Sequence, residues 1–249
     1  MTADLGHILE YWDREDVESM YDKHLLNAEI ELIRRRLAPG SKILDAGCGE
    51  GEGTLAYSML PGAKVHAVDF SATRLRKAQA CVAGRGNVTF QQVDFLKPYR
   101  LDRDFDAIVS QRFLINLPEW ELQGRVLLEL MEHLKPGGRL LMLEGSQPGV
   151  DELNGFRAAC GLEPIPVKWH NLFFDDEVLV GFMREHGYPL AEVDGLGSYL
   201  LLTRGVRPLL DAKLDWNCEF NARAASPAVD ASLRLGARFS RLKLWVFRK

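Results

Sequence analysis

Between residues 42 and 145, short apolar runs alternate with stretches of helical pattern, and this alternation constrains the fold more than any other feature. The apolar runs lie at residues 42–47, 64–70, 87–95, 105–113 and 138–145. The helical stretches between them begin near Thr54, Ala72 and Pro118. Strands that alternate with helices favour a parallel sheet covered on both faces. The sequence therefore predicts an α/β fold.

The flanking segments follow a different pattern. Residues 16–37 are predicted to form one helix, with Val17, Tyr21, His24 and Ala28 on one face. Further elements are predicted downstream at 175–187 (a helix), 189–195 and 241–249 (strands). Two long segments, 146–175 and 196–240, break the alternation, and loops of that length in a compact domain usually carry function.

A glycine-rich stretch, "ILDAGCGEGEGT" at residues 43–54, follows the first apolar run. Gly47, Gly49 and Gly51 can adopt backbone angles closed to other residues and let a ligand approach the main chain. Such a strand–loop–helix junction is a natural site for part of a nucleotide-like ligand. A dinucleotide fingerprint would need its third glycine at position 52, which is Glu52. The flanking acids must therefore identify the ligand.

Three carboxylates stand at or near the ends of successive predicted strands. Asp45 precedes the glycines and can accept hydrogen bonds from an ammonium group, which a dinucleotide lacks. Asp69 ends the second strand, where a carboxylate can accept both hydroxyls of a ribose. Asp94 ends the third strand, beside Phe95, and can accept from the amine of an adenine. Together they predict a ligand with an amine, a ribose and an adenine.

This set resembles the class I S-adenosylmethionine-dependent methyltransferases, of the small-molecule type. The resemblance is carried by "ILDAGCGEG", "VHAVDFS", "VTFQQVDF", "FDAIVSQRFLINLP" and "LKPGGRLLMLE", in the family's order and at its spacing. It implies a Rossmann-like seven-stranded mixed sheet in the order 3-2-1-4-5-7-6, with strand 7 antiparallel, helices on both faces and cap insertions. It also implies S-adenosyl-L-methionine over the ends of strands 1 and 2, with Gln111 and Arg112 facing the donor methyl.

The same resemblance sets the expected domain organisation and completes the cofactor contacts. The chain is expected to be one domain, 1–249, with a helical N-terminal cap at 1–38 and a cofactor-binding core at 40–145. The two insertions, 146–175 and 196–240, are expected to cover the substrate. Phe70 and Trp12 are added to the predicted cofactor contacts, although Trp12 and Tyr11 could equally pack on the sheet edge.

His170 is the predicted catalytic base, because it lies in an insertion rather than at a helix end or on a core strand. Activity should then rise with pH through an ionisation near neutrality. Arg112 is the second predicted catalytic residue. The predicted substrate contacts are Asn116, Asn171, Trp169, Arg157 and His24. Polar and cationic groups suit a hydroxylated or anionic acceptor, so O-methylation of a sugar-like or anionic metabolite is favoured.

Several alternatives stay open on the sequence alone. A small amine would need no base, and N-methylation is the first alternative. A cofactor-binding regulatory protein without catalysis, or a protein or glycan acceptor, is compatible with the same motifs. A nicotinamide-dependent oxidoreductase is disfavoured by Glu52 and by the extra acids. No "NPPY"-type motif follows residue 113, which disfavours amino groups of nucleobases or of protein glutamine.

Composition limits the partners. The net charge is −4 and the isoelectric point is near 5.9, which gives no basic field for nucleic acid or an acidic membrane. The four cysteines include no CxxC pair, and we expect no metal and mostly buried, reduced thiols. Without a basic n-region or a long apolar stretch, a cytoplasmic protein is expected. The oligomeric state is not determined by these features.

Overall fold

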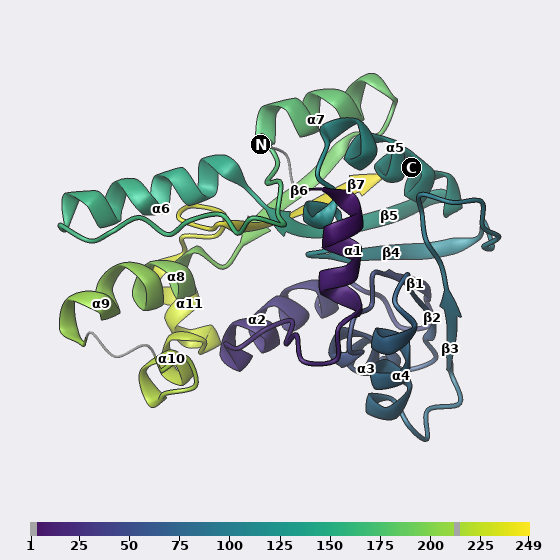
Figure 1. Ribbon diagram of the computed structural model, residues 1–249, viewed down its shortest axis with the longest axis horizontal. Coiled ribbons are helices and arrows are strands. Elements are labelled where there is room, and N and C mark those ends of the chain that lie inside the picture. The colour runs from purple at the N-terminus through teal and green to yellow at the C-terminus, as the bar shows by residue number, and fades with distance from the viewer. Residues whose placement is uncertain (1–3, 212–214) are drawn as a thin grey trace.

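A seven-stranded sheet forms the centre of the protein (Figure 1), whose computed structural model describes residues 4–211 and 215–249. The strands are β1 (Lys42–Ala46), β2 (Lys64–Asp69), β3 (Val88–Gln92), β4 (Phe105–Gln111), β5 (Leu134–Gly145), β6 (Leu190–Gly195) and β7 (Leu242–Arg248). Their order is β3-β2-β1-β4-β5-β7-β6. The first five pair in parallel, whereas β7 is antiparallel to β5 and β6. The predicted fold class is confirmed.

Helices connect and extend the strands. Those of the core region are α1 (Leu5–Asp13), α2 (Lys23–Arg34), α3 (Glu52–Ser58), α4 (Ala72–Cys81), the 3-10 turn η1 (Leu114–Asn116), α5 (Trp120–His133) and α7 (Asp176–Glu185). Those within the insertions are α6 (Gln147–Ala159), α8 (Gly197–Leu200), the π-helical turn η2 (Leu201–Val206), α9 (Arg207–Leu210), α10 (Glu219–Ala224) and α11 (Pro227–Leu233). Side-chain caps fix several starts: Ser146 accepts from Gly149 N, and Pro148 follows in the first turn of α6.

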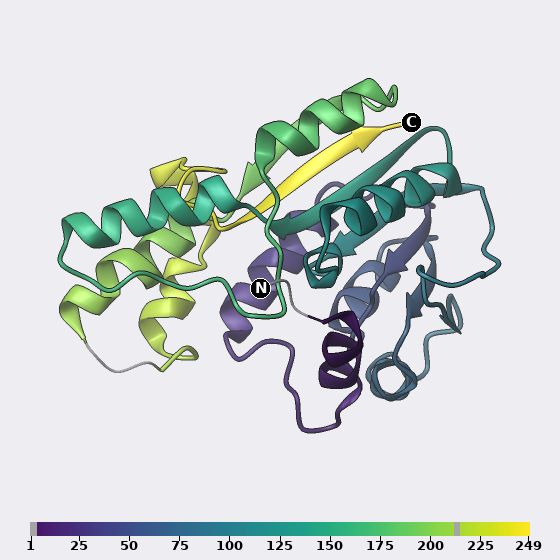
Figure 2. The same ribbon diagram turned by 45° about the horizontal axis from the view of Figure 1, so that its top comes forward.

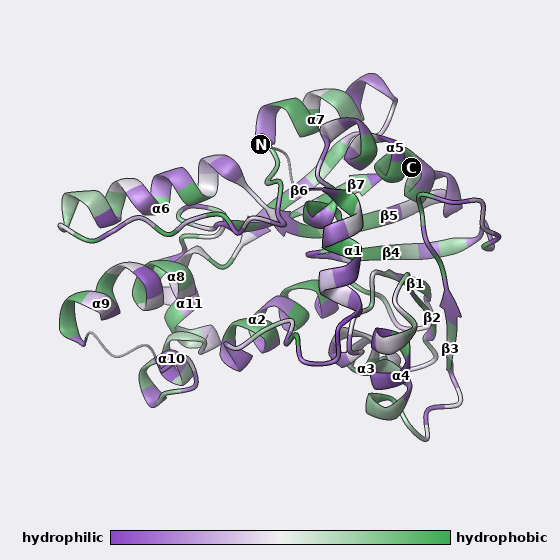
Figure 3. Ribbon diagram, in the orientation of Figure 1, coloured by the Kyte–Doolittle hydropathy of each residue, from purple (hydrophilic) through white to green (hydrophobic). Residues whose placement is uncertain are grey.

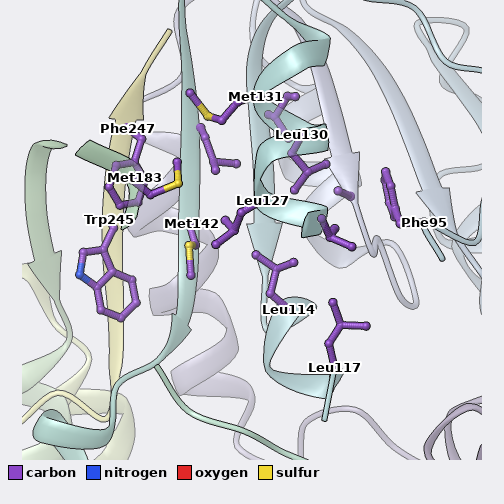
Figure 4. Packing of buried hydrophobic residues seen from close by; sticks show 14 of the residues in the cluster. Phe95, Leu114, Leu117, Leu127, Leu130, Met131, Met142, Met183, Trp245 and Phe247 are labelled. Atoms are coloured by element: carbon purple, nitrogen blue, oxygen red, sulfur yellow. The ribbon is translucent and has the colours of Figure 1, made fainter. Parts of the chain in front are cut away.

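Each face of the sheet carries its own hydrophobic core, because successive residues of a strand point to opposite sides. Leu44 and Ile108 join α5, α7 and η1 in one cluster, whereas Ile43 and Val109 join α2 and α3 in the other. On the first face, α5 directs Leu127, Leu130 and Met131 toward Met142 of β5 (Figure 4). Burying a side chain of this size contributes about 1.5–3 kcal/mol.

The helices of both insertions gather beyond the carboxyl ends of the central strands (Figures 1 and 2). Helix α6 starts directly after β5 ends, and α8 starts directly after β6. Helix α1 crosses in front of the sheet near the same ends (Figure 1). Most of these helices carry both hydrophobic and hydrophilic residues (Figure 3), as expected for elements with one packed and one solvated face.

Several predicted elements differ from the structure. The helix expected over 16–37 begins only at Lys23, as α2, because the Asp22 side chain accepts from Leu25 N and caps the helix there, whereas residues 16–22 form turns and irregular structure. Val17 and Tyr21 therefore lie outside any helix. The strand expected over 87–95 ends at Gln92, and Asp94 instead forms a turn by accepting from Leu96 N.

Two further expectations are corrected. The insertions, expected as loops, contain α6 and α8–α11. None of the four cysteines is buried: all are free thiols, Cys81 is exposed, and the other three are partly exposed. Within the described residues, no helix is long and apolar enough to cross a membrane. The same part of the chain holds no group of three metal-ligating side chains.

Candidate active site

A cavity of about 580 Å³ opens at the carboxyl ends of β1, β2 and β4. Its lining includes residues of the glycine loop, of α1, and of both insertions. Crevices at the carboxyl ends of strands in open α/β sheets are the usual ligand sites of such folds, and this volume lies in the range of small-molecule pockets. Most of the residues predicted from sequence meet here.

The glycine loop needs glycine for two distinct reasons. Gly47 has φ 72°, and a Cβ there would lie 2.6 Å from Cβ of Phe113. Gly51 has φ 88° and precedes α3, where a Cβ would lie 2.8 Å from Cα of Ala78. Gly47 and Gly49 line the cavity, but Gly51 does not. Gly51 thus serves the packing of α3 on α4, and its predicted ligand contact is not supported by this placement.

Two buried carboxylates face the cavity beside this loop. Asp45 is 4% exposed and accepts from the Thr54 hydroxyl at 2.5 Å. Asp69 is 7% exposed and accepts from Gly49 N at 3.0 Å and Ser71 N at 2.9 Å. Burial raises the pKa of Asp45 to about 6, with the Asp69 charge adding to the effect, and burial also raises the pKa of Asp69. Neither carboxylate forms an ion pair among the described residues, although the Arg74 charge lowers the pKa of Asp69 and offsets part of the effect of burial.

The third predicted acid has a different environment. Asp94 lines the cavity but also pairs with the exposed Lys97 ammonium at 2.9 Å. Phe95 is buried, lines the cavity and contacts the rings of Tyr99 and Phe113. Phe70, after β2, lines the same region. Asp94 and Phe95, the residues predicted to bind an adenine, therefore both line the cavity.

Helix α1 is fastened over this region by polar contacts. The Arg74 guanidinium donates to the backbone oxygens of Trp12 and Val17 and pairs with Glu50. Ser71 donates to Asp13 at 2.5 Å. Trp12 lines the cavity, so α1 supplies part of the wall.

At the end of β4, a buried carboxylate that the sequence analysis missed organises the predicted residues. Glu29 of α2 is fully buried, accepts from Gln111 Nε2 at 2.7 Å and pairs with Arg112 Nε at 3.2 Å. Burial raises its pKa, against the opposing effects of Arg112 and Gln111. Arg112 has φ 52°, an uncommon conformation for a residue with a side chain. Glu29 lies on a regular helical face, so no sequence signal separated it from surface acids.

His170 is buried within an aromatic cluster and lines the cavity. It stacks on Tyr11 at 4.9 Å between ring centroids and contacts Trp12 and Trp169 at 5.2 Å. Its Nδ1 has no hydrogen-bond partner among the described residues. Burial, and then the Lys168 charge, lower its pKa to about 4. The expected ionisation near neutrality is therefore wrong: this imidazole is neutral at physiological pH.

The predicted substrate contacts separate into two groups. Asn116, Asn171 and Arg157 line the cavity. Asn116 is already engaged, because its Oδ1 accepts from Trp12 and Asn171 while its Nδ2 donates to backbone oxygens. Trp169 is 51% exposed and packs against His7 outside the lining. His24, in the first turn of α2, is also outside it.

Three cations that were not singled out from sequence also line the cavity. Lys168 lies between α6 and α7, Arg204 lies in η2, and Arg241 immediately precedes β7. A lysine or arginine in an insertion is usually a surface residue, and only the folded chain shows that these three line the same cavity.

Comparison with known proteins identifies the central part of the chain. Residues 43–138 match the family model described as a methyltransferase domain. This part of the chain is therefore similar to methyltransferase domains. The demethylmenaquinone methyltransferase of Anoxybacillus flavithermus is 31% identical over 157 residues, which cover 60% of this chain and 62% of that relative. That of Geobacillus stearothermophilus is 32% identical over 155 residues, covering 61% and 64%. The chain thus spans less than two thirds of the length of the curated relatives it matches.

The likeness to solved structures extends over almost the whole chain. The [4+2]-cyclase SpnF aligns with a TM-score of 0.61 at 20% identity, covering 94% of this chain and 84% of that one. A methyltransferase from Geobacter sulfurreducens, solved with S-adenosyl-L-homocysteine, aligns with a TM-score of 0.54 at 17% identity, covering 97% and 98%. At these identities the likeness shows the fold alone.

The Geobacter sulfurreducens neighbour was solved with S-adenosyl-L-homocysteine, and the residues of this cavity fit a ligand of that kind. Asp45 and Asp69 are buried and raised in pKa, and neither forms an ion pair among the described residues; a cationic ligand would stabilise both in their charged form. The open space beside Gly49, where an added Cβ would meet no atom within 4 Å, leaves the main chain accessible to it.

Proposed function

We propose that this protein transfers a methyl group from S-adenosylmethionine to a small polar acceptor. The observation that carries the proposal is the pair of buried carboxylates, Asp45 and Asp69, beside the glycine loop. A dinucleotide phosphate placed beside the glycine loop would be repelled by Asp45, whereas a ligand with an ammonium and a sulfonium would be attracted.

Each cofactor residue then has a distinct role. Asp45 accepts from the ammonium group, and the Thr54 hydroxyl donates to Asp45 Oδ2 and so holds the carboxylate in position. Asp69 keeps lone pairs free for the ribose hydroxyls, since each oxygen accepts only one backbone N–H. Asp94 and Phe95 take the adenine edge and face. When bound, the cofactor supplies an electrophilic methyl group on a sulfonium.

The acceptor is proposed to lie among Arg112, Arg157 and His170. Neutral His170 can accept a hydrogen bond from an acceptor hydroxyl through its unpartnered nitrogen, which orients the oxygen for attack. Because its pKa is only about 4, we assign it mainly this orienting role and expect a modest contribution as a base. Methylation of a hydroxyl is therefore our first choice and that of a deprotonated amine the second.

The names of the relatives suggest a quinone acceptor as another possibility for the same domain. That acceptor is disfavoured here by the cations of the cavity wall, because burying cations against an uncharged ring leaves them uncompensated. The likeness to a cyclase also means that fold alone does not settle the reaction.

Calorimetry and a transfer assay test the proposal together. S-adenosylhomocysteine should bind, and NAD should show no comparable binding. Methyl-labelled S-adenosylmethionine should then label a hydroxylated acid in preference to an uncharged quinone or an amine from the same panel. Binding of NAD without a response to S-adenosylhomocysteine would refute the cofactor, and binding without transfer to any member of the panel would favour a regulatory protein.

A further inference from the structure

We propose that Lys168, Arg204 and Arg241 form an oxyanion subsite that holds a carboxylate or phosphate group of the acceptor, which deepens the function proposed above and rests on it. The three residues come from separate parts of the chain, and all three line the cavity. Two of the predicted residues, Arg112 and Arg157, line it as well.

The subsite has more positive than negative charge. Arg204 pairs with Asp22 at 2.6 Å, and Arg112 pairs with Glu29 at 3.2 Å. Among the described residues, Arg157 donates to the backbone oxygens of Glu163 and Arg204 and to no carboxylate.

The remaining cations have weaker partners or none. Within the described residues, the Lys168 ammonium and the Arg241 guanidinium form no hydrogen bond or ion pair. Arg241 lies over the Phe173 ring, 5.4 Å from its centroid. At this end of the cavity, five cations thus stand against the two carboxylates of Asp22 and Glu29, and Arg207 and Asp211, one of each sign, leave this excess unchanged.

A buried donor at this end of the cavity also lacks an acceptor. Arg204 packs its guanidinium over the Trp216 ring at 3.9 Å and uses Nη2 for Asp22. Its Nη1 is buried and has no hydrogen-bond partner among the described residues. An unsatisfied buried donor on a charged group is costly, so this nitrogen is a place where a ligand oxygen would be stabilised.

The positive charges of these side chains also repel one another, which lowers their pKa values. Burial lowers the pKa of Arg241 to about 10, with Arg204 and Arg112 contributing to the decrease. Burial lowers the pKa of Lys168, and Arg112 and Arg241 lower it further. Burial and then Arg204 lower the pKa of Arg157. Such repulsion inside a chain of net charge −4 indicates a site built for an anion rather than a solvated surface.

The chemistry of these donors defines the ligand class. A guanidinium presents N–H groups in a planar fork that matches the oxygens of a carboxylate or a phosphate, and a lysine adds a point charge. An uncharged sugar or an apolar ring would leave the excess charge in place. The acceptor is therefore a small molecule with an oxyanion at one end and the methylated group at the other.

The test uses the full chain saturated with S-adenosylhomocysteine and two probes, inorganic phosphate and acetate, in isothermal titration calorimetry. At least one probe should bind the wild type, and Arg241→Met and Lys168→Met should each weaken that binding about tenfold or more. Arg85→Met and Lys64→Met, at exposed positions outside the cavity, are the matched controls and should bind as the wild type does. Tighter phosphate than acetate assigns a phosphate-bearing acceptor, and the reverse order assigns a carboxylate.

Thermal unfolding in anion-free buffer gives a second readout. Arg241 is partly buried and repelled by Arg204 and Arg112, so Arg241→Met should raise the unfolding midpoint by a few degrees and abolish most of the increase that phosphate gives the wild type. Absence of probe binding in a protein that binds S-adenosylhomocysteine would overturn the subsite and leave the cofactor proposal standing. Equal probe binding by wild type and both variants would overturn it too, whereas loss of S-adenosylhomocysteine binding itself would count against the proposed function.

Discussion

Replacing Asp45 by asparagine is expected to stabilise the ligand-free protein and to weaken cofactor binding. The pKa of this buried carboxyl rises from 3.8 to about 6 on folding. That change corresponds to about 3 kcal/mol of destabilisation by the ionised form. Asparagine has nearly the same shape and retains an oxygen that can accept from Thr54. We expect Asp45→Asn to gain about 1–3 kcal/mol at pH 7, since relaxation around the charge reduces the full value.

The sign of the effect depends on pH. Because the folded pKa lies above the unfolded value, the neutral acid is favoured in the fold. The penalty is absent below about pH 4 and complete above about pH 6. The two proteins should therefore have equal stability at low pH and diverge as the pH rises through this window, as measured by urea unfolding at several pH values.

Binding should change in the opposite direction. Loss of the charged acceptor for an ammonium group should weaken S-adenosylhomocysteine by roughly 10–100-fold in calorimetry, the scale of a charged hydrogen bond. Asp106→Asn is the control. Burial raises the pKa of Asp106, but hydrogen bonds from Lys42 N and from Lys135 outweigh burial and lower it overall. Asp106→Asn should therefore have a lower free energy of unfolding and bind S-adenosylhomocysteine as tightly as the wild type. An Asp45→Asn protein with unchanged stability and affinity would refute the reasoning.

Three further outcomes are expected. Asp69→Ala should lose about 1.5–3 kcal/mol of S-adenosylhomocysteine affinity by calorimetry, and a folded variant with wild-type affinity would mean that the ribose lies elsewhere. His170→Ala should lower kcat by about 10²-fold with little change in cofactor affinity. Because the pKa of His170 is about 4, the wild-type kcat should show no ionisation of this residue between pH 6 and 8. A single ionisation near neutrality that disappears in the variant would contradict this expectation. Limited proteolysis should cut 146–175 and 196–240 more slowly when S-adenosylhomocysteine is bound, and equal rates would count against these segments as a cap.

Local sequence patterns predicted the central region well. Apolar runs of strand length, separated by amphipathic helices, predicted the parallel pairing of β1–β5, whereas the strand order was implied by the resemblance. The glycines and the acids near the strand ends lie together because parallel strands bring their carboxyl ends to one edge. Boundaries were less well predicted where side chains compete with the pattern. Asp22 caps α2 and Asp94 forms a turn, and both shorten the elements expected around them.

The sequence by itself determined the α/β class and brought the glycine loop and the acids to one predicted site, because these follow from periodicity and from motifs that are contiguous in the chain. Only the tertiary structure decided the acceptor end. There, Glu29 is buried beneath Arg112, His170 loses its near-neutral pKa through burial and the Lys168 charge, and Arg204 meets Arg241. Burial and electrostatic interactions between residues distant in sequence set these properties, and neither is encoded in any local pattern.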